Sequence, residues 1–508
     1  MNASLETIRR LQAWSDGKPS PRGEVVNVHV ADDENLLVVA FVRMGGESRP
    51  WGVALGTLDS DPIFFTVPDG RNRQLVGDMM IEVADHLLSH FDHPGWSEAG
   101  PSEDGIDTLR QIWLPGPTHV QMLHHLAAAY ARTRWERDDV DTLRALGNLC
   151  NALFIESQRP GQQTVISATA ALRTCWVFPT ANVRQGHLGH LLAWLRGGRG
   201  RNARLEAALE AEQRSMATVL NPDDERRTLE PLVAKWTEAR RAGDTKSMAR
   251  EQKKIDAALR ESLRERWEAT AEAARMIATD RRAYNSGLDV LVADSVKQMF
   301  RTWGQKTIAE EAGGEPYWPN VFTDNNPRSA GAAFQRRIAH DEKARHMLVH
   351  GDRELQREEL AAGHGVICRI TNIGTKGSTW KATWSYPALP TLKEGNKLSI
   401  AGAPEMKLEV VDIDIDGAVL ILAPGWKRTK TGLGDLGLAP DDPRWRNKDL
   451  VLLDSPAYEL TERKATTASK QFGPEDITNL LRNPRWRHAA RDEDGRVVEA
   501  APDEGDPR

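Results

Sequence analysis

NLLVVAFVRMGGESRPWGVALGTL, residues 35–58, is the stretch that decides how the first part of the chain folds. Two apolar runs are joined by GGES, and short polar, Gly-containing joints of this kind mark turns between strands. The run EVVNVHV (24–30) precedes this stretch, and IFFTV (63–67) follows it. The pattern predicts a meander of three or four antiparallel strands.

The spacing of apolar residues changes after this meander. From Leu75 to Leu88 the apolar residues recur at helical spacing, which predicts one amphipathic helix over 73–91. A short apolar piece at 111–114 could add a further strand. Together these elements predict a mixed α/β domain over residues 1–115.

Residues 116–350 carry helical periodicity, and their charged part contains a turn at Gly243–Asp244. An apolar stripe ends at Trp236 before this turn, and another begins at Met248 after it. A narrow apolar seam with heavily charged outer faces is typical of two packed antiparallel helices. The sequence therefore predicts a helical domain with a protruding antiparallel hairpin near 223–280.

Residues 363–460 return to strand patterns. They contain six short apolar runs: VICRITNIG, STWKATWSY, KLSIAG, KLEVVDIDI, AVLILAPGW and DLVLLDS. Six short strands with turns between them fit a small β-barrel or a sandwich. We predict the barrel, whose closure would remove exposed strand edges. The acidic stretch 461–508 is poor in apolar residues, which predicts a largely disordered tail. The predicted fold class is therefore α+β with several domains.

Composition excludes two broad classes of protein. The 508 residues are 40% hydrophobic and 28% charged, with a net charge of −6. This balance is too polar for an integral membrane protein and too apolar for a wholly disordered chain. Three cysteines far apart in the sequence suit a reducing compartment. We therefore expect a cytoplasmic protein with no membrane partner.

Two motifs that resemble ligand sites lack the residues that such sites need. DIDIDG (412–417) matches the opening of a calcium-binding loop, but position 12 of that loop is Ala423 where a bidentate Glu is required. GLGDLG (432–437) matches a dinucleotide-binding fingerprint by its letters, but prolines follow it where a helix must begin. No P-loop motif occurs. We therefore predict no catalytic residue, no metal site and no cofactor.

Basic residues beside tryptophans give a positive signal around the predicted barrel. WKRTK (426–430) follows one strand and RWRNK (444–448) precedes the last, so barrel closure could bring both to one rim. Two tryptophans at even spacing on another strand share a face. Cationic loops for phosphates and an aromatic face for bases are how OB-like barrels bind single strands. The predicted nucleic-acid-binding residues are Lys427, Arg428, Lys430, Arg444, Arg446, Lys448, Trp380 and Trp384. The alternative is that the tryptophans form the barrel core and the cations are ordinary solvated loop residues.

These patterns favour a non-enzymatic, nucleic-acid-associated accessory subunit. Such a subunit would belong to a larger bacterial complex, of the helicase type or with a role in phage defence. It would bind another protein subunit through its helical region. A second possibility is a pure interaction scaffold, in which the surplus of tryptophan (16 residues) marks protein interfaces.

A third possibility comes from the order of elements in the first domain. Three strands, a helix and a further strand resemble the element order of RNase H-like domains. The resemblance implies metal-binding carboxylates on the first strand and first helix, for which Glu24, Glu82 and Asp85 are the candidates. The centre of the run 24–30 offers no Asp, so a divergent metal-dependent nuclease stays the alternative.

Overall fold

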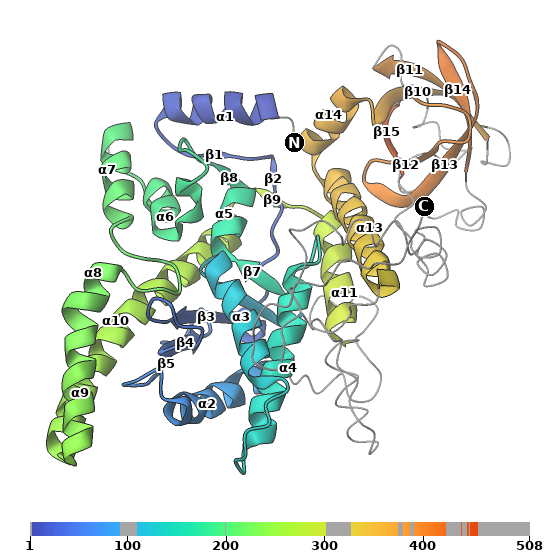
Figure 1. Cartoon of the computed structure of the whole chain (residues 1–508). Coiled ribbons are helices and arrows are strands. Elements are labelled where there is room, and N and C mark those ends of the chain that lie inside the picture. Colours follow the sequence, from blue (N-terminus) through green and yellow to red (C-terminus); the bar gives the residue numbers. More distant parts are fainter. Residues whose placement is uncertain are drawn as a thin grey trace, which may run out of the picture. The chain divides into compact units, whose positions relative to one another are not determined.

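The computed structural model describes residues 3–91, 109–198, 200–300, 327–373, 379–386, 391–422, 438, 444, 446 and 448–455 (Figure 1). Contacts divide the chain into two units. One unit comprises Met1–Pro319 and Lys343–Pro456, and the other comprises Asn320–Glu342 and Ala457–Arg508. Within the described ranges, no helix is both long enough and apolar enough to cross a membrane. The predicted tail over 461–508 lies outside the described residues.

A five-stranded sheet lies at the centre of the N-terminal part. Its order is β5-β4-β3-β6-β7. The first three in the chain are antiparallel neighbours, and the last two run parallel to β3. The strands are β3 (Leu36–Val42), β4 (Gly52–Gly56), β5 (Ile63–Thr66), β6 (Gln111–Leu114) and β7 (Val165–Ser167). The predicted meander and the predicted strand at 111–114 are confirmed.

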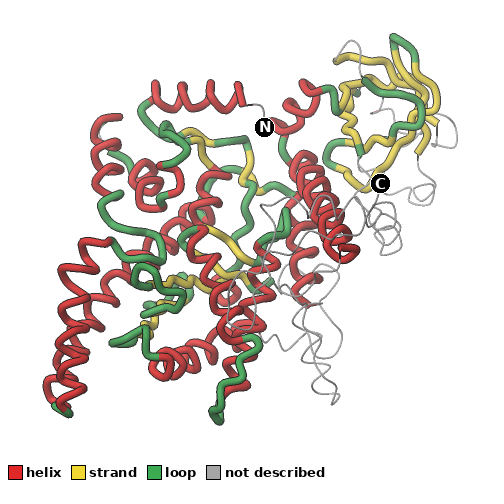
Figure 2. Tube along the Cα trace, viewed as in Figure 1, coloured by secondary structure: helices red, strands yellow, loops and turns green. Residues whose placement is uncertain are grey.

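Helices cover both faces of this sheet, which makes it the middle of three layers. Leu36, Val38, Ala40 and Val42 of β3 pack in one cluster with the apolar seam of α10 (Thr245–Ala278). The alternate residues Leu37, Val39 and Phe41 pack in another cluster, whose members come from α2 (Arg73–Phe91), α3 (Pro117–Tyr130) and α4 (Val140–Ser157). Figure 2 shows these strands enclosed by helices. Burial on both faces explains why β3 is apolar throughout instead of alternating.

Two sequence predictions for this part were wrong. The run 24–30 does not join the meander. Only Val25–Val26 (β2) of this run is paired with another strand, in parallel with β9 (Ala283–Tyr284). The polar residues of the run bind other parts of the chain, since the Asn27 amide donates to Asp352 at 3.0 Å. The region 116–350, predicted to be helical, contains strand β7, in which Val165 and Ile166 are buried in the sheet, and α5 (Ala168–Cys175) follows it.

The predicted helical hairpin is present as α9 (Glu230–Ala242) and α10. Gly243 between them adopts a left-handed conformation (φ 70°), and the Asp244 carboxylate caps α10 by accepting the Ser247 N–H at 3.1 Å. The hairpin does not simply protrude as expected. The apolar seam of α10 continues into the sheet, where the Trp267 indole donates to the Val38 carbonyl at 3.2 Å.

The C-terminal strands form a closed six-stranded antiparallel barrel, as predicted. Its order is β10-β11-β14-β13-β12-β15. The bounds are β10 (Gly365–Ile373), β11 (Thr379–Tyr386), β12 (Lys397–Ile400), β13 (Ala403–Ile413), β14 (Gly417–Leu422) and β15 (Asp449–Asp454). The DIDIDG motif is the β13–β14 turn. The Asp414 carboxylate accepts the N–H groups of Asp416 and Gly417 at 2.8 and 2.7 Å, which is how Asp stabilises a tight turn.

The other elements among the described residues are short strands and helices, most of which lie before the barrel in the sequence. They are α1 (Ala3–Asp16), β1 (Ser20–Pro21), η1 (Asp33–Asn35), β8 (Trp176–Val177), η4 (Arg184–Gly186), α6 (Leu188–Arg196), α7 (Arg201–Ala211), α8 (Pro222–Asp224), η5 (Glu225–Leu229), α11 (Gly287–Met299), α13 (Pro327–Gly351) and α14 (Arg353–Ala362).

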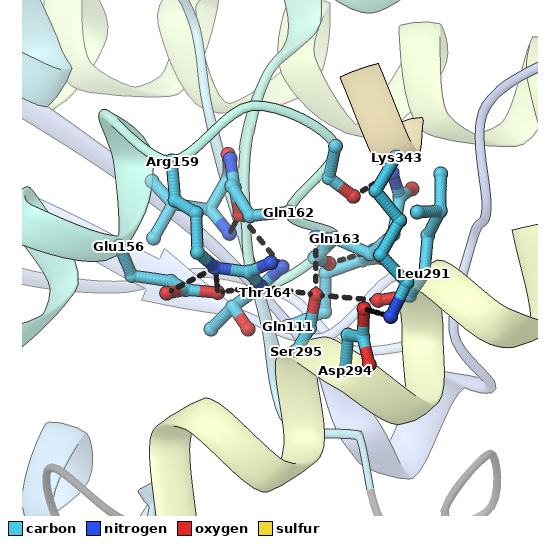
Figure 3. A network of polar contacts seen from close by, with 12 residues as sticks. Gln111, Glu156, Arg159, Gln162, Gln163, Thr164, Leu291, Asp294, Ser295 and Lys343 are labelled. Atoms are coloured by element: carbon cyan, nitrogen blue, oxygen red, sulfur yellow. Dashed lines mark hydrogen bonds and ion pairs between the residues drawn. The ribbon is translucent and has the colours of Figure 1, made fainter. Parts of the chain in front are cut away.

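A buried polar network joins the end of α4, the segment before β7 and helix α11 (Figure 3). Arg159, which lies two residues beyond the end of α4, forms an ion pair with Glu156 of that helix. Its Nη2 also donates to the Ser295 hydroxyl at 3.0 Å, and that hydroxyl accepts the Gln163 N–H at 2.8 Å. Gln111 extends the network into β6 by donating to the Gln163 carbonyl at 2.7 Å. These polar groups satisfy one another and fix where β7 enters the sheet.

Helix α4 packs closely against the end of α3 at Gly147. A Cβ at this position would lie 2.2 Å from the backbone nitrogen of Ala131. Because backbone cannot yield as a side chain can, Gly147→Ala is expected to lower the free energy of unfolding by about 1–3 kcal/mol, measured by urea denaturation. Gly186→Ala is the control, since a Cβ there would meet no atom within 4 Å. Equal stability of the two variants would contradict the prediction.

Candidate nucleic-acid interface

The two predicted tryptophans of the barrel differ in their surroundings. Trp380 is fully buried in the barrel core, together with Val366, Leu398 and Leu420. The Trp384 ring is half-buried against this core, and its Nε1 donates to the Asp414 carbonyl at 3.3 Å. A wholly enclosed ring cannot stack on a base while the barrel is closed. The aromatic face predicted from even spacing is therefore not available at Trp380, which is a core residue.

The predicted cations of the barrel rim are only partly described. Arg444 and Arg446 are exposed, and Lys448 is half-buried. Lys427, Arg428 and Lys430 lie outside the described residues, so the convergence of the two loops stays a prediction. On the adjoining strands, Arg369 of β10 is paired with Asp449 of β15 at 2.8 Å.

The carboxylates proposed for a nuclease are dispersed. Glu82 and Asp85 are exposed on α2, and Glu24 is exposed and lies 3.6 Å from Arg357. Strand β3, which is the first of the sheet, carries no acidic residue at all. In the part of the chain that the structure describes, no three His, Cys, Asp or Glu side chains are grouped so that they could hold a metal ion.

A basic and aromatic cluster that the sequence reasoning missed lies where α2 begins and α3 ends. We call it the arginine–tryptophan cluster, and its members are Arg49, Arg73, Arg132, Arg134, Trp135 and Arg137. The guanidinium carbons of Arg73 and Arg137 lie 4.2 and 4.7 Å from the Trp135 ring centroid. Both distances are within the range of cation–π attraction. Burial raises the pKa of Tyr130, and the charges of Arg49, Arg73 and Arg137 oppose this rise. Arg49 therefore lies near Tyr130 together with the two stacked arginines.

Local structure holds the Trp135 ring in this position. Gly77 of α2 provides the space, since a Cβ there would lie 2.6 Å from the ring and from Arg137 Nη1. The Thr133 hydroxyl accepts from Arg73 Nη2 and from the Trp135 N–H, both at 3.3 Å. Arg144 of α4 donates to the Thr133 carbonyl at 3.0 Å. The α3–α4 connection is therefore hydrogen-bonded to α2 through Arg73 and to α4 through Arg144.

The charges of the cluster are unequally compensated. Arg137 is paired with Asp139 and, at 2.9 Å, with Asp78. Arg49, Arg73, Arg132 and Arg134 form no ion pair within the described ranges, and the last three are exposed. Glu136 and Asp138 are exposed beside them. Among the described residues, four arginines of the cluster therefore have no carboxylate partner. The five arginines and the four carboxylates of Asp78, Glu136, Asp138 and Asp139 together carry a net charge of +1.

Strand directions place the cluster at one particular edge of the sheet. Arg49 lies in the turn after β3, and Arg73 begins the helix that follows β5. Since β4 is antiparallel to both strands, β3 and β5 end at the same edge. Strand β6 is parallel to β3 and ends there too. Ligands of open α/β sheets bind at the carboxyl ends of strands, beside the point where strand order reverses.

The centre of this carboxyl edge is filled by protein. His119 of α3 is fully buried, and its Nδ1 accepts the Phe41 N–H at 3.1 Å while its Nε2 lies 3.1 Å from the Met216 carbonyl. Burial lowers the pKa of His119 to about 3, so the ring is neutral. The segment after α7 then covers β3, where the Arg43 N–H donates to the Thr218 carbonyl at 2.8 Å. This leaves the rim of the edge, where the cluster lies, as the accessible part.

The sequence did contain a signal for the cluster. Arg134-Trp135-Glu136-Arg137 has the same basic–aromatic character as RWRNK (444–448). Because Trp135 continues the apolar stripe of the preceding helix, the pattern predicts a core residue at this position and does not distinguish it from a surface cluster. No protein-family model matches the chain, and no curated protein or solved structure is significantly similar to it.

Proposed function

We propose that the protein is a non-enzymatic, nucleic-acid-associated subunit that contacts a phosphate backbone through the arginine–tryptophan cluster. The observation that carries this proposal is the placement of two guanidinium groups against the Trp135 ring, beside arginines that have no carboxylate partner among the described residues. Stacked guanidinium groups are held in fixed positions, and their planar forks match phosphate oxygens.

The strand order of the sheet supports the same proposal. Numbered along the chain, the five strands lie in the order 3-2-1-4-5. This order resembles that of RNase H-like domains, and the resemblance implies nucleic acid at the carboxyl edge. The first strand, LLVVAFV, lacks the carboxylate that metal-dependent cleavage requires. Binding without cleavage is therefore the function that this sheet supports best.

The barrel supplies a possible second contact in the same proposal. Lys427, Arg428 and Lys430 would join Arg444, Arg446 and Lys448 on one rim, as the sequence predicts. The helical hairpin of α9 and α10 would bind another subunit of a larger complex, of the helicase or phage-defence type. Its exposed faces are charged, which suits a protein partner that is recognised by ion pairs.

Charge reversal in the α3–α4 connection tests the cluster. Arg132→Glu/Arg134→Glu is expected to weaken binding of a fluorescent 20-nucleotide strand or duplex at least tenfold, measured by anisotropy. The slope of log K against log salt concentration should fall in magnitude by about 1.5, because each lost phosphate contact contributes roughly 0.7–0.9.

Matched variants separate the cluster from general charge effects. Arg241→Glu/Lys246→Glu makes the same charge change at the exposed tip of the hairpin and should bind as the wild type does. Lys427→Glu/Arg428→Glu tests the barrel contact separately. Equal weakening by the hairpin variant, or no salt-dependent binding by the wild type, would contradict the proposal.

The strand order also favours one alternative, a divergent nuclease. Under our proposal, Mg²⁺ or Mn²⁺ produces no cleavage of labelled single- or double-stranded oligonucleotides. Cleavage that depends on either metal and disappears in Glu82→Ala would establish the alternative.

A further inference from the structure

A cavity of about 360 Å³ lies between α10, the segment after α7 and the turn formed by α8 and η5. Its apolar wall includes Leu220, Leu229 and Leu259, and its polar wall includes Ser215 and Ser262. This volume falls within the usual range of small-molecule sites, roughly 300–1,000 Å³. The cavity is separate from the residues that carry the proposed function.

Arg266 of α10 is the unusual member of this wall. It is only 1% exposed. Its Nε donates to the Ala217 carbonyl at 2.8 Å, and its Nη1 donates to the carbonyl and hydroxyl of Ser262 at 2.8 and 2.5 Å. Its Nη2 has no hydrogen-bond partner among the described residues, yet it is not fully enclosed by protein atoms. Arg266 is one of the residues that line the cavity, and Nη2 is the atom of its guanidinium for which no hydrogen bond is formed among the described residues.

The charge of Arg266 is not neutralised in the usual way. Burial lowers the pKa of its guanidinium to about 10, against the charges of Glu265 and Asp224, so it remains cationic at neutral pH. No carboxylate within the described ranges forms an ion pair with it. Arginine is rarely fully buried without a charged partner, because the cost of removing it from water is high. An anionic group at Nη2 would offset this cost.

The rim of the cavity has the opposite charge. Asp224 and Glu261 are exposed there, and Glu265 is paired with Arg214 at 2.6 Å. Two cationic and three anionic side chains therefore line the cavity. A dianion such as phosphate is disfavoured by these acids, whereas a ligand with an inner anion and an outer cation meets complementary charges at both ends.

We propose that this cavity binds a basic amino acid, with the carboxylate against Arg266 and the side-chain cation between Asp224 and Glu261. The methylene chain of such a ligand would lie along the leucines of the apolar wall. Its net charge of about +1 at neutral pH complements the lining. This inference is independent of nucleic-acid binding.

Calorimetric titration with L-lysine and L-arginine tests the proposal. Saturable binding and a raised melting temperature are expected with both amino acids. Cadaverine, which lacks the carboxylate, and glutarate, which lacks the cation, should bind at least tenfold more weakly. No saturable binding of either amino acid, equal binding of cadaverine, or tighter binding of inorganic phosphate would overturn it.

Two variants and one matched control locate the site. Asp224→Asn/Glu261→Gln changes only exposed rim residues and should weaken L-lysine binding at least tenfold. Asp223→Asn alters the exposed neighbour of Asp224, which does not line the cavity, and should bind as the wild type does. Arg266→Met should abolish binding. If Arg266→Met does not fold, because the hydrogen bond to the Ala217 carbonyl is lost, Asp224→Asn/Glu261→Gln alone decides the test. Wild-type affinity in the rim variant would place any binding elsewhere.

Discussion

Arg159→Ala is expected to lower the free energy of unfolding by about 3–5 kcal/mol, which is the usual cost of removing one partner of a buried ion pair. Glu156 is 3% exposed and depends on Arg159 for its compensating charge (Figure 3). The same substitution removes the donor at 3.0 Å from the Ser295 hydroxyl. Urea denaturation at pH 7 measures the loss.

The pH dependence of this variant distinguishes an unpaired charge from simple loss of packing. Burial already raises the pKa of Glu156 in the folded protein, against the charge of Arg159. Without Arg159, the pKa of Glu156 in the folded state rises further. Near neutral pH the folded variant therefore keeps a proton on Glu156, whereas the carboxyl group of the unfolded chain is ionised. The variant is therefore expected to lose less stability than the wild type as the pH falls from 7 to 5, so the difference in the free energy of unfolding between the two proteins becomes smaller.

A double variant is the matched control. Glu156→Gln/Arg159→Met removes both charges and keeps most of the volume, so it should recover much of the stability that Arg159→Ala loses at pH 7. A loss below about 1 kcal/mol in Arg159→Ala, the typical value for exposed pairs, would show that this pair is not buried in solution.

Elements held by local patterns could be predicted from the sequence. The barrel strands alternate and are separated by turn residues, so their number and approximate positions could be predicted from short stretches such as 412–417. Closure of the barrel depends on the pairing of β15 with β10 and β12, which lie far from it in the sequence. The helical hairpin followed from Gly243, where only a residue that tolerates a left-handed backbone ends one helix and starts another. The runs of the central sheet were recognisable because both faces of β3 are buried.

Features that depend on distant residues could not be predicted. The run 24–30 alternates like a strand, but Asn27 and His29 bind Asp352 and Tyr284, which lie far along the chain. Arg137 is near the Trp135 ring in the sequence, but the second stacked guanidinium, that of Arg73, comes from the distant helix α2. Arg266 has the spacing of an ordinary charged helix residue, and its burial follows from the segment that packs over α10.

Mild acid is expected to destabilise the junction between α13 and the barrel. His346 and His350 of α13 are buried against Ser399 of β12. Their Nε2 atoms lie 3.2 Å apart, and His350 Nε2 lies 3.0 Å from the Ser399 hydroxyl. At this distance one imidazole can donate a hydrogen bond to the other while both rings are neutral. Protonation of both rings would place two cations in contact.

The direction of the pH effect follows from these surroundings. Burial lowers the pKa of His346 to about 4, helped by Lys407 and opposed by Glu359. Burial and the neighbouring His346 lower the pKa of His350 to about 3. In the unfolded chain both imidazoles titrate near 6.5. Their contribution is therefore complete above that pH and is lost as the pH falls toward the folded-state values.

Between pH 7 and pH 5, the two imidazoles together are expected to lower the free energy of unfolding by about 4 kcal/mol. Each imidazole contributes about 1.4 kcal/mol per pH unit below its unfolded-state pKa of about 6.5. Urea denaturation of the wild type and of His346→Gln/His350→Gln at pH 7 and pH 5 measures it. His90 and His119, whose pKa values burial also lowers, add acid sensitivity that both proteins share. The difference between the two pH dependences therefore isolates the junction. If both proteins lose the same stability between pH 7 and pH 5, the two imidazoles are not buried against the barrel in solution.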